Sequence, residues 1–235
     1  MLKRTRALWK RRAQARIFEM TGMQGLLDER WQHALEDHMG FRGQIPEHRR
    51  FQIDQLKKRG LKPASSLLEI GCGPLTLGIP AIDYLDAGHY VGVDVRSEVL
   101  NMSWQEVGRA ELSGKNPRLI CSDNFGSESL GDGTFDFIWS FSVLFHLSDD
   151  ILDRLFGFVA ERLSPGGLFF GNVQTFMESS TWLQFPFLKR SLEDYETSAA
   201  RHGLKMKRHG TLEELGFRLD RAERMNDLLQ WTRAP

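Results

Sequence analysis

From residue 61 onward, short apolar runs alternate with stretches whose apolar residues have helical spacing. The apolar runs predict parallel strands at residues 66–70, 90–94, 118–121, 135–140 and 168–173. The stretches between them predict helices at residues 79–85, 97–112 and 148–163. Strands that alternate with helices are typical of an α/β protein with a mostly parallel, doubly wound sheet.

The last part of the chain follows a different pattern. A helix is expected at residues 192–202, and two further strands are expected at residues 204–207 and 227–232. Little helical sequence separates these two strands, whereas a parallel pair needs a crossover connection that is usually a helix. The pattern therefore predicts an antiparallel pair at one edge of the sheet.

Residues 1–60 are expected to form an N-terminal helical extension, ahead of a second domain at residues 61–235. Residues 47–58 predict one helix, which Gly60 ends. Residues 1–20 carry seven basic side chains and, if helical, one apolar face. Such a helix either contacts an anionic membrane surface or a protein partner, or packs its apolar stripe on its own domain.

Composition excludes several classes of function. The charges balance, with 31 Lys and Arg against 31 Asp and Glu. Nucleic-acid enzymes usually carry a basic excess that neutralises phosphates, so nucleic acid is disfavoured as the main partner. Two cysteines, Cys72 and Cys121, make neither a metal cluster nor a disulfide framework. Without an apolar membrane span or signal core, the protein is expected to be cytoplasmic.

A glycine-rich turn follows the first predicted strand, in the sequence Glu69-Ile70-Gly71-Cys72-Gly73-Pro74. Glycine permits a tight turn and a close approach to a ligand, and open α/β sheets bind ligands outside the carboxyl ends of their strands. The turn departs from the dinucleotide fingerprint, because Thr76 stands where a third small residue is expected. A nucleotide-like ligand without a diphosphate is therefore favoured, and a purely structural turn is the alternative.

Two carboxylates follow the next strands. Asp94 ends the second strand, 21 residues after Gly73, where it can accept hydrogen bonds from both hydroxyls of a ribose. Asp123 follows the third strand and can accept from an adenine amine, with Phe125 as an apolar wall. The alternative for each is a solvated loop carboxylate, which is common in turns.

With these features the chain resembles the class I S-adenosylmethionine (SAM)-dependent methyltransferases over roughly residues 67–232. Four segments carry the resemblance, in the order that the family has them: residues 68–73, 91–94, 135–147 and 163–167. The resemblance implies a Rossmann-like sheet of seven strands, mostly parallel with an antiparallel last strand. Leu75 stands where many members have a third glycine, so we expect a turn of different shape.

The resemblance also implies a cofactor site for SAM and no metal. Its cofactor contacts fall on Glu69, Gly71, Cys72, Gly73, Asp94, Val95, Asp123, Asn124, Ser140 and Phe141. A hydroxyl or protonated amine acceptor needs a base, and His146 is the candidate because histidine titrates near neutrality. The alternative is a histidine that caps a loop.

The acceptor is expected to be a small molecule. The stretch Ser140-Phe141-Ser142-Val143 lacks the Asn/Asp-Pro-Pro-aromatic motif of the family's amine-directed DNA and protein enzymes. Substrate contacts are expected from the long connection at residues 176–188, which contains Trp182. The alternative is that the aromatic residues of this connection belong to the packed core or to a dimer surface. On the other side, Arg49 and Arg50, beside His48, are candidates to hold a carboxylate or phosphate of the substrate.

Three functions are compatible with the sequence. The first is a small-molecule methyltransferase. The second is a non-catalytic methyltransferase-like protein that binds SAM and acts through a partner. The third is an NAD(P)-dependent oxidoreductase that uses Asp94 and Arg96, although Thr76 and the terminal strand pair argue against it.

Overall fold

A computed structural model describes residues 45–176, 178–182, 185–218 and 222–234. The basic segment at residues 1–20 lies outside the described residues. Contacts along the chain define a compact unit at Gln44–Pro235. None of the helices in the described part is long and apolar enough to cross a bilayer.

One sheet of seven strands organises this unit, in the order β3-β2-β1-β4-β5-β9-β8. Its strands are β1 (Leu67–Ile70), β2 (Tyr90–Asp94), β3 (Arg118–Cys121), β4 (Phe135–Ser140), β5 (Leu163–Val173), β8 (Leu204–Thr211) and β9 (Asp227–Arg233). The first five pair in parallel, and β9 is antiparallel to both β5 and β8. The predicted doubly wound, Rossmann-like sheet with an antiparallel last strand is confirmed.

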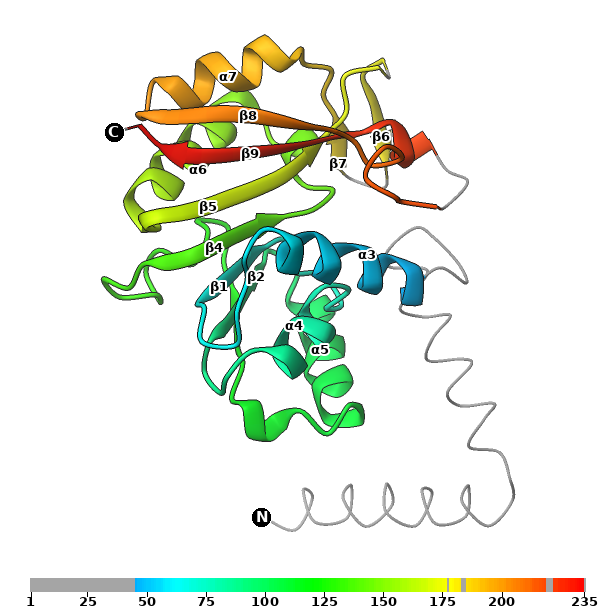
Figure 1. Ribbon diagram of the computed structural model, residues 1–235, viewed down its shortest axis with the longest axis vertical. Helices are drawn as coiled ribbons and strands as arrows, with labels where there is room; N and C mark the ends of the chain where they lie inside the picture. The colour runs from blue at the N-terminus through cyan, green and yellow to red at the C-terminus, as the bar shows by residue number, and fades with distance from the viewer. Residues whose placement is uncertain (1–44, 177, 183–184, 219–221, 235) are drawn as a thin grey trace. The chain divides into compact units, whose positions relative to one another are not determined.

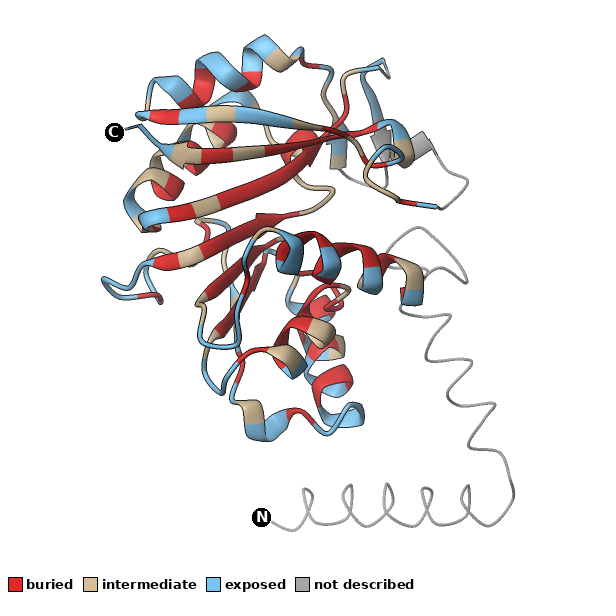
Figure 2. Ribbon diagram, in the orientation of Figure 1, coloured by how far each residue is buried: buried red, intermediate tan, exposed pale blue. Residues whose placement is uncertain are grey.

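Helices cover both faces of the sheet (Figure 1). They are α3 (Ile45–Lys58), α4 (Gly78–Tyr84), α5 (Ser97–Arg109), α6 (Asp149–Arg162) and α7 (Leu192–Ala200). Alternate strand residues face opposite layers, so Phe169 of β5 belongs to one core cluster with residues of α6 and α7, and Phe170 belongs to a second cluster with residues of α3, α4 and α5. The central strands are buried on both faces, as Figure 2 shows.

Helix α3 belongs to the core of this unit, although the sequence analysis placed it in the N-terminal extension. Phe51, Ile53 and Leu56 are buried against the sheet. Gln52 is also buried, and its Oε1 accepts a 2.9 Å hydrogen bond from the indole nitrogen of Trp139 in β4. The compact unit therefore begins ahead of α3, at Gln44, and not at residue 61.

Two local features differ from the sequence expectation. Strand β5 begins at Leu163, so residues 164–167, which lie between the helix and the strand predicted from the sequence, are inside the strand, where its pairing with β4 shifts register. The connection at residues 176–188 contains a hairpin, β6 (Ser180–Trp182) and β7 (Phe185–Phe187). Its strands are too short for an alternating pattern to identify them.

The bond between Gln52 and Trp139 generates a stability prediction. Gln52→Ala leaves the buried indole N–H without its acceptor, which costs about 1–3 kcal/mol of unfolding free energy. Asp54→Ala, at an exposed position of the same helix, is the control and should change stability little. Urea denaturation of the two variants checks this, and equal destabilisation of both would contradict the assigned role of Gln52.

Candidate cofactor and acceptor site

The turn after β1 requires glycine for two separate reasons. Gly71 and Gly73 have φ of 74° and 49°, in the left-handed region that favours glycine. A Cβ on Gly71 would also lie 2.3 Å from Cγ2 of Val143, in the loop after β4. The amides of Gly71 and Cys72 both donate to the carbonyl of Val93 in β2, at 2.8 and 3.0 Å. The turn is thus held in place by hydrogen bonds to β2 and by close contact with the loop after β4.

Leu75 has a left-handed backbone conformation at the position where the resemblance led us to expect a third glycine. Its φ is 61°, and its side chain is fully buried. A Cβ on Gly78 would lie 2.4 Å from Cδ2 of Leu75, so the missing side chain of Gly78 leaves room for the leucine. The leucine at this position therefore changes the packing beside the turn, and Gly78 leaves the space that the leucine side chain occupies.

The carboxylate of Asp94 joins the end of β2 to the glycine turn. One oxygen accepts from the Gly73 amide at 2.9 Å, and the other accepts from the amide and Nε of Arg96 at 3.0 and 3.1 Å. The side chain is buried at the rim of the sheet. The spacing between Gly73 and Asp94 that sequence analysis emphasised thus corresponds to direct contact.

Glu69 lies beneath the turn. It is buried, and its Oε2 accepts a 2.5 Å hydrogen bond from the hydroxyl of Tyr90. Burial raises the pKa of Glu69 to about 8, although the bond from Tyr90 acts in the opposite direction. Cys72 is also buried, and burial raises the pKa of its thiol well above the ordinary value. Both side chains therefore support the turn from the core side.

The loop after β2 carries an exposed apolar side chain, and the loop after β3 carries an aspartate and an asparagine. Val95, directly after Asp94, is 55% exposed. Asp123 is exposed after β3, and Asn124 is fixed by bonds to Ser122 and Ser127. An exposed apolar side chain beside a carboxylate suits a flat heterocycle with an exocyclic amine.

The loop after β4 closes over the glycine turn. Ser140 donates from Oγ to the Ile70 carbonyl at 3.2 Å, and Phe141 stacks on Trp139 with ring centroids 5.9 Å apart. Ser142 has a φ of 57°, and its amide donates to Oδ1 of Asn172 in β5 at 2.5 Å. These contacts press Val143 against Gly71.

His146 ends the short 3-10 helix η2 (Leu144–His146). Its Nδ1 donates to the carbonyl of Pro186 at 2.6 Å, so Nε2 carries the lone pair in the neutral ring. The rings of Phe145 and Phe187 pack on it, with centroids 4.7 and 4.5 Å away. Burial lowers its pKa, the charge of Arg96 acts in the same direction, and the bond to Pro186 opposes them. The neutral ring is therefore favoured.

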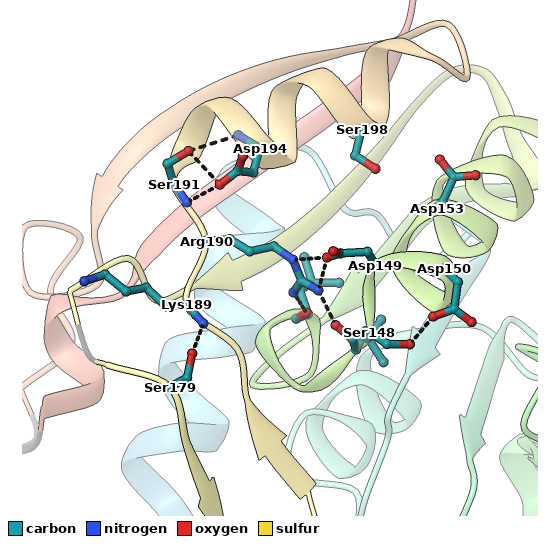
Figure 3. Close-up of polar contacts among 12 residues, drawn as sticks. Ser148, Asp149, Asp150, Asp153, Ser179, Lys189, Arg190, Ser191, Asp194 and Ser198 are labelled. Atoms are coloured by element: carbon teal, nitrogen blue, oxygen red, sulfur yellow. Dashed lines mark hydrogen bonds and ion pairs between the residues drawn. The ribbon is translucent and has the colours of Figure 1, made fainter.

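Arg190 fixes the base of the β6–β7 hairpin to the β4 loop. Its guanidinium donates to Asp149 at 2.7 and 2.9 Å and to the Leu147 carbonyl at 2.6 Å. Figure 3 shows this arginine reaching from the segment before α7 to the start of α6. The Leu188 amide adds a 2.8 Å bond to the carbonyl of Phe145. The hairpin that contacts His146 is thus anchored to the loop that carries it.

The two arginines expected to bind substrate are engaged elsewhere. Arg49 donates to Glu106 of α5 at 2.9 Å, and Arg50 pairs with Glu47 on the exposed side of α3. His48, between Glu47 and Arg49, is buried and faces the ring of Phe141, with centroids 6.2 Å apart. The structure therefore brings His48, and not the arginines, to the β4 loop.

Trp182 ends β6, where it pairs with Phe185 of β7. Asn172 and Glu223 both contact the β4 loop through Ser142, and neither was predicted from the sequence. A polar residue within the apolar run of β5 is the sequence feature that marks Asn172. Nothing local marks Glu223, which meets Ser142 from 81 residues away.

Comparisons with known proteins agree with this geometry. Residues 68–169 match the family model described as a methyltransferase domain. An uncharacterised methyltransferase of Schizosaccharomyces pombe is 30% identical over 94 residues, which are 39% of this chain and 34% of that protein. The matched region thus spans about a third of the length of that curated relative.

Solved structures share the fold. A SAM-dependent methyltransferase from Clostridium acetobutylicum has a TM-score of 0.65 at 14% identity and covers 89% of this chain and 100% of its own. The magnesium protoporphyrin IX methyltransferase from Synechocystis, with bound SAM, has a TM-score of 0.60 at 15% identity over 85% and 84%. A glycopeptide N-methyltransferase in complex with S-adenosylhomocysteine (SAH) has 0.61 at 14% over 78% and 89%. Residues 68–169 are thus similar to a methyltransferase domain, and the chain shares the fold of class I SAM-dependent methyltransferases.

The buried Glu69 generates a pH prediction. Its pKa rises from 4.5 to about 8 on folding, so its stabilising contribution is complete below about pH 4.5 and is lost as pH rises to about 8. Wild-type stability should then fall by up to about 1.4 kcal/mol per pH unit more steeply than that of Glu69→Gln.

Thermal and urea unfolding at several pH values measure this difference. Glu98→Gln removes an exposed carboxylate at the start of α5 and should keep the wild-type slope. Parallel pH profiles for wild type and Glu69→Gln would show that Glu69 does not take up a proton on folding.

Proposed function

We propose that this protein transfers the methyl group of SAM to a small-molecule acceptor and releases SAH. The observation that carries the proposal is the carboxylate of Asp94, held at the lip of the Gly71–Gly73 turn beside the exposed Val95. Family and structural comparisons support the same activity. A balanced net charge and the absence of the Asn/Asp-Pro-Pro-aromatic motif favour a small-molecule acceptor. A cytoplasmic location stays a prediction from the sequence.

The residues at the carboxyl edge of the sheet fit the parts of SAM. Asp94 would accept the ribose hydroxyls, Val95 would face the adenine ring, and Asp123 would accept from the adenine amine. Gly71, Gly73 and the Ser140–Phe141 segment would flank the methionine part. Glu69 and Cys72 would act from beneath the turn, since both are buried below it. When bound, SAM supplies a methyl group that its sulfonium already activates.

The protein's chemical tasks are orientation, exclusion of water and removal of a proton. The hairpin fixed by Arg190 covers η2 and keeps His146 in one tautomer through the Pro186 carbonyl. A neutral imidazole with a lowered pKa is available as a base at neutral pH. We propose that Nε2 of His146 accepts the proton that the acceptor loses.

Calorimetric titration with SAM, SAH and NAD tests the cofactor assignment. SAM and SAH should bind and NAD should not. Asp94→Ala should weaken SAM binding by roughly 10- to 100-fold, which corresponds to the free energy of hydrogen bonds to a charged group. Asp94→Asn should also weaken SAM binding, with less disturbance of the turn. Asp83→Asn, at an exposed position of α4, should leave the affinity unchanged. Binding of NAD without SAM would overturn the proposal.

Methyl transfer from labelled SAM to a pool of small metabolites tests the base. His146→Gln should lower the rate by about 10²- to 10⁴-fold while leaving SAM affinity unchanged. His202→Gln, next to α7 and paired with Asp153 of α6, is the matched control. SAM binding with no transfer by the wild type would favour the non-catalytic alternative. An unchanged rate in His146→Gln would remove His146 from the reaction.

A further inference from the structure

Glu223 brings a carboxylate to the loop after β4. It lies in η3 (Ala222–Met225), the short 3-10 helix before β9. Its Oε1 accepts a 2.6 Å hydrogen bond from Ser142 Oγ, and its Oε2 lies 3.6 Å from Nε2 of His48. The side chain is 14% exposed, whereas the His48 side chain is 1% exposed. The carboxylate is thus oriented by two elements while part of it stays accessible.

This carboxylate is close to the proposed methyl donor. Ser142, which it binds, is also held through its amide by Asn172 at 2.5 Å. The next residue, Val143, lies against Gly71 in the proposed cofactor turn. Glu223 therefore contacts the loop that separates the donor site from β5, on the α3 side of the sheet.

Buried polar groups without partners lie at the same end of β5. Within the described part of the chain, Asn172 Nδ2 and both polar atoms of the Gln174 side chain make no hydrogen bond. Both residues are almost fully buried. Leaving such a group unsatisfied costs about 1–3 kcal/mol, which points to a polar molecule that satisfies them. Gln174, two residues beyond Asn172, is a candidate for such contacts.

The remaining surroundings favour a cation. The rings of Phe51 and Phe217 lie 5.0 Å apart, and Phe217 lies 4.9 Å from His48. These rings exclude water from the inner side of the carboxylate, and a partly desolvated carboxylate stabilises positive charge. The nearby arginines are directed to other carboxylates, Arg49 to Glu106 and Arg50 to Glu47. A substrate carboxylate or phosphate would meet a like charge from Glu223 and no arginine from α3.

We propose that Glu223 binds the acceptor as an amine, so that the enzyme is an N-methyltransferase for small amines. This inference rests on the proposed function. Glu223 holds the ammonium form of the substrate, and His48 positions Glu223. The ammonium loses one proton to Nε2 of His146. The freed nitrogen lone pair then forms a bond to the methyl carbon as the carbon–sulfur bond breaks. Sulfur keeps that electron pair in neutral SAH, and the methylated nitrogen carries the positive charge.

Three compounds with the same phenyl-ethyl body test this selectivity: phenethylamine, phenethyl alcohol and hydrocinnamate. Each is titrated into the complex of the full chain with SAH, and each is offered as a methyl acceptor with labelled SAM. Phenethylamine should bind at least roughly tenfold more tightly than the other two and be the preferred acceptor. Glu223→Gln should weaken its binding and turnover by roughly 10- to 100-fold, the value of one charged hydrogen bond.

The control is Glu213→Gln, which neutralises a half-exposed carboxylate that pairs with Arg224 and should keep the amine preference. Glu223→Asp keeps the charge and should retain part of that preference, and it replaces Glu223→Gln if the latter does not fold. If the wild type shows no amine preference, or if Glu223→Gln leaves that preference unchanged, this inference is overturned. Binding of SAH in the same experiment would still support the proposed function. Loss of SAH binding in the wild type overturns the proposed function itself.

Discussion

The hydrogen bond from the Gly73 amide to the Asp94 carboxylate is the contact on which the rest of the site depends. It joins the turn after β1 to the end of β2, and these two strands are adjacent in the sheet. The turn also lies under Val143 with no space for a side chain at Gly71. The backbone of the turn is thus fixed from two sides before any ligand binds, so binding need not order it.

This arrangement concentrates unfavourable backbone conformations at the carboxyl edge of the sheet. Among the described residues, Leu75, Phe125 and Ser142 have positive φ in the loops after β1, β3 and β4. A left-handed conformation at a residue other than glycine persists only where its surroundings determine it. Burial of Leu75 beside Gly78 and the bond from Ser142 to Asn172 are such surroundings. The sheet core therefore stabilises loops that would not adopt these shapes alone.

The parts of the molecule predictable from sequence are those with a local cause. Strands β2, β3 and β4 have the predicted bounds, because short, mostly apolar runs between turn residues mark a strand. Asp94 was identifiable because strand ends and the glycine turn meet at one edge of a parallel sheet. The cofactor half of the site follows from such short-range rules.

The acceptor half depends on long-range contacts that leave little trace in the local sequence. Helix α3 carries polar residues on its buried side, and Gln52 is tolerated there because Trp139 supplies its partner. That pattern resembles a solvated extension until the partner is known. For Arg49 and Arg50, charge alone predicted a substrate contact, whereas in the structure they pair with Glu106 and Glu47.

The cofactor part and the acceptor part of the proposed site differ in how their carboxylates are hydrogen-bonded. On the cofactor side, Asp94 has its oxygens engaged by backbone amides and by Arg96, which fixes its orientation within the fold. On the proposed acceptor side, Glu223 contacts a hydroxyl and a histidine, and the amides of Asn172 and Gln174 have unused hydrogen-bonding capacity among the described residues. A ligand shared by many related enzymes can be met by a fixed turn. We propose that the acceptor is recognised by groups from α3, β5 and η3, which are far apart in the sequence and meet at the β4 loop.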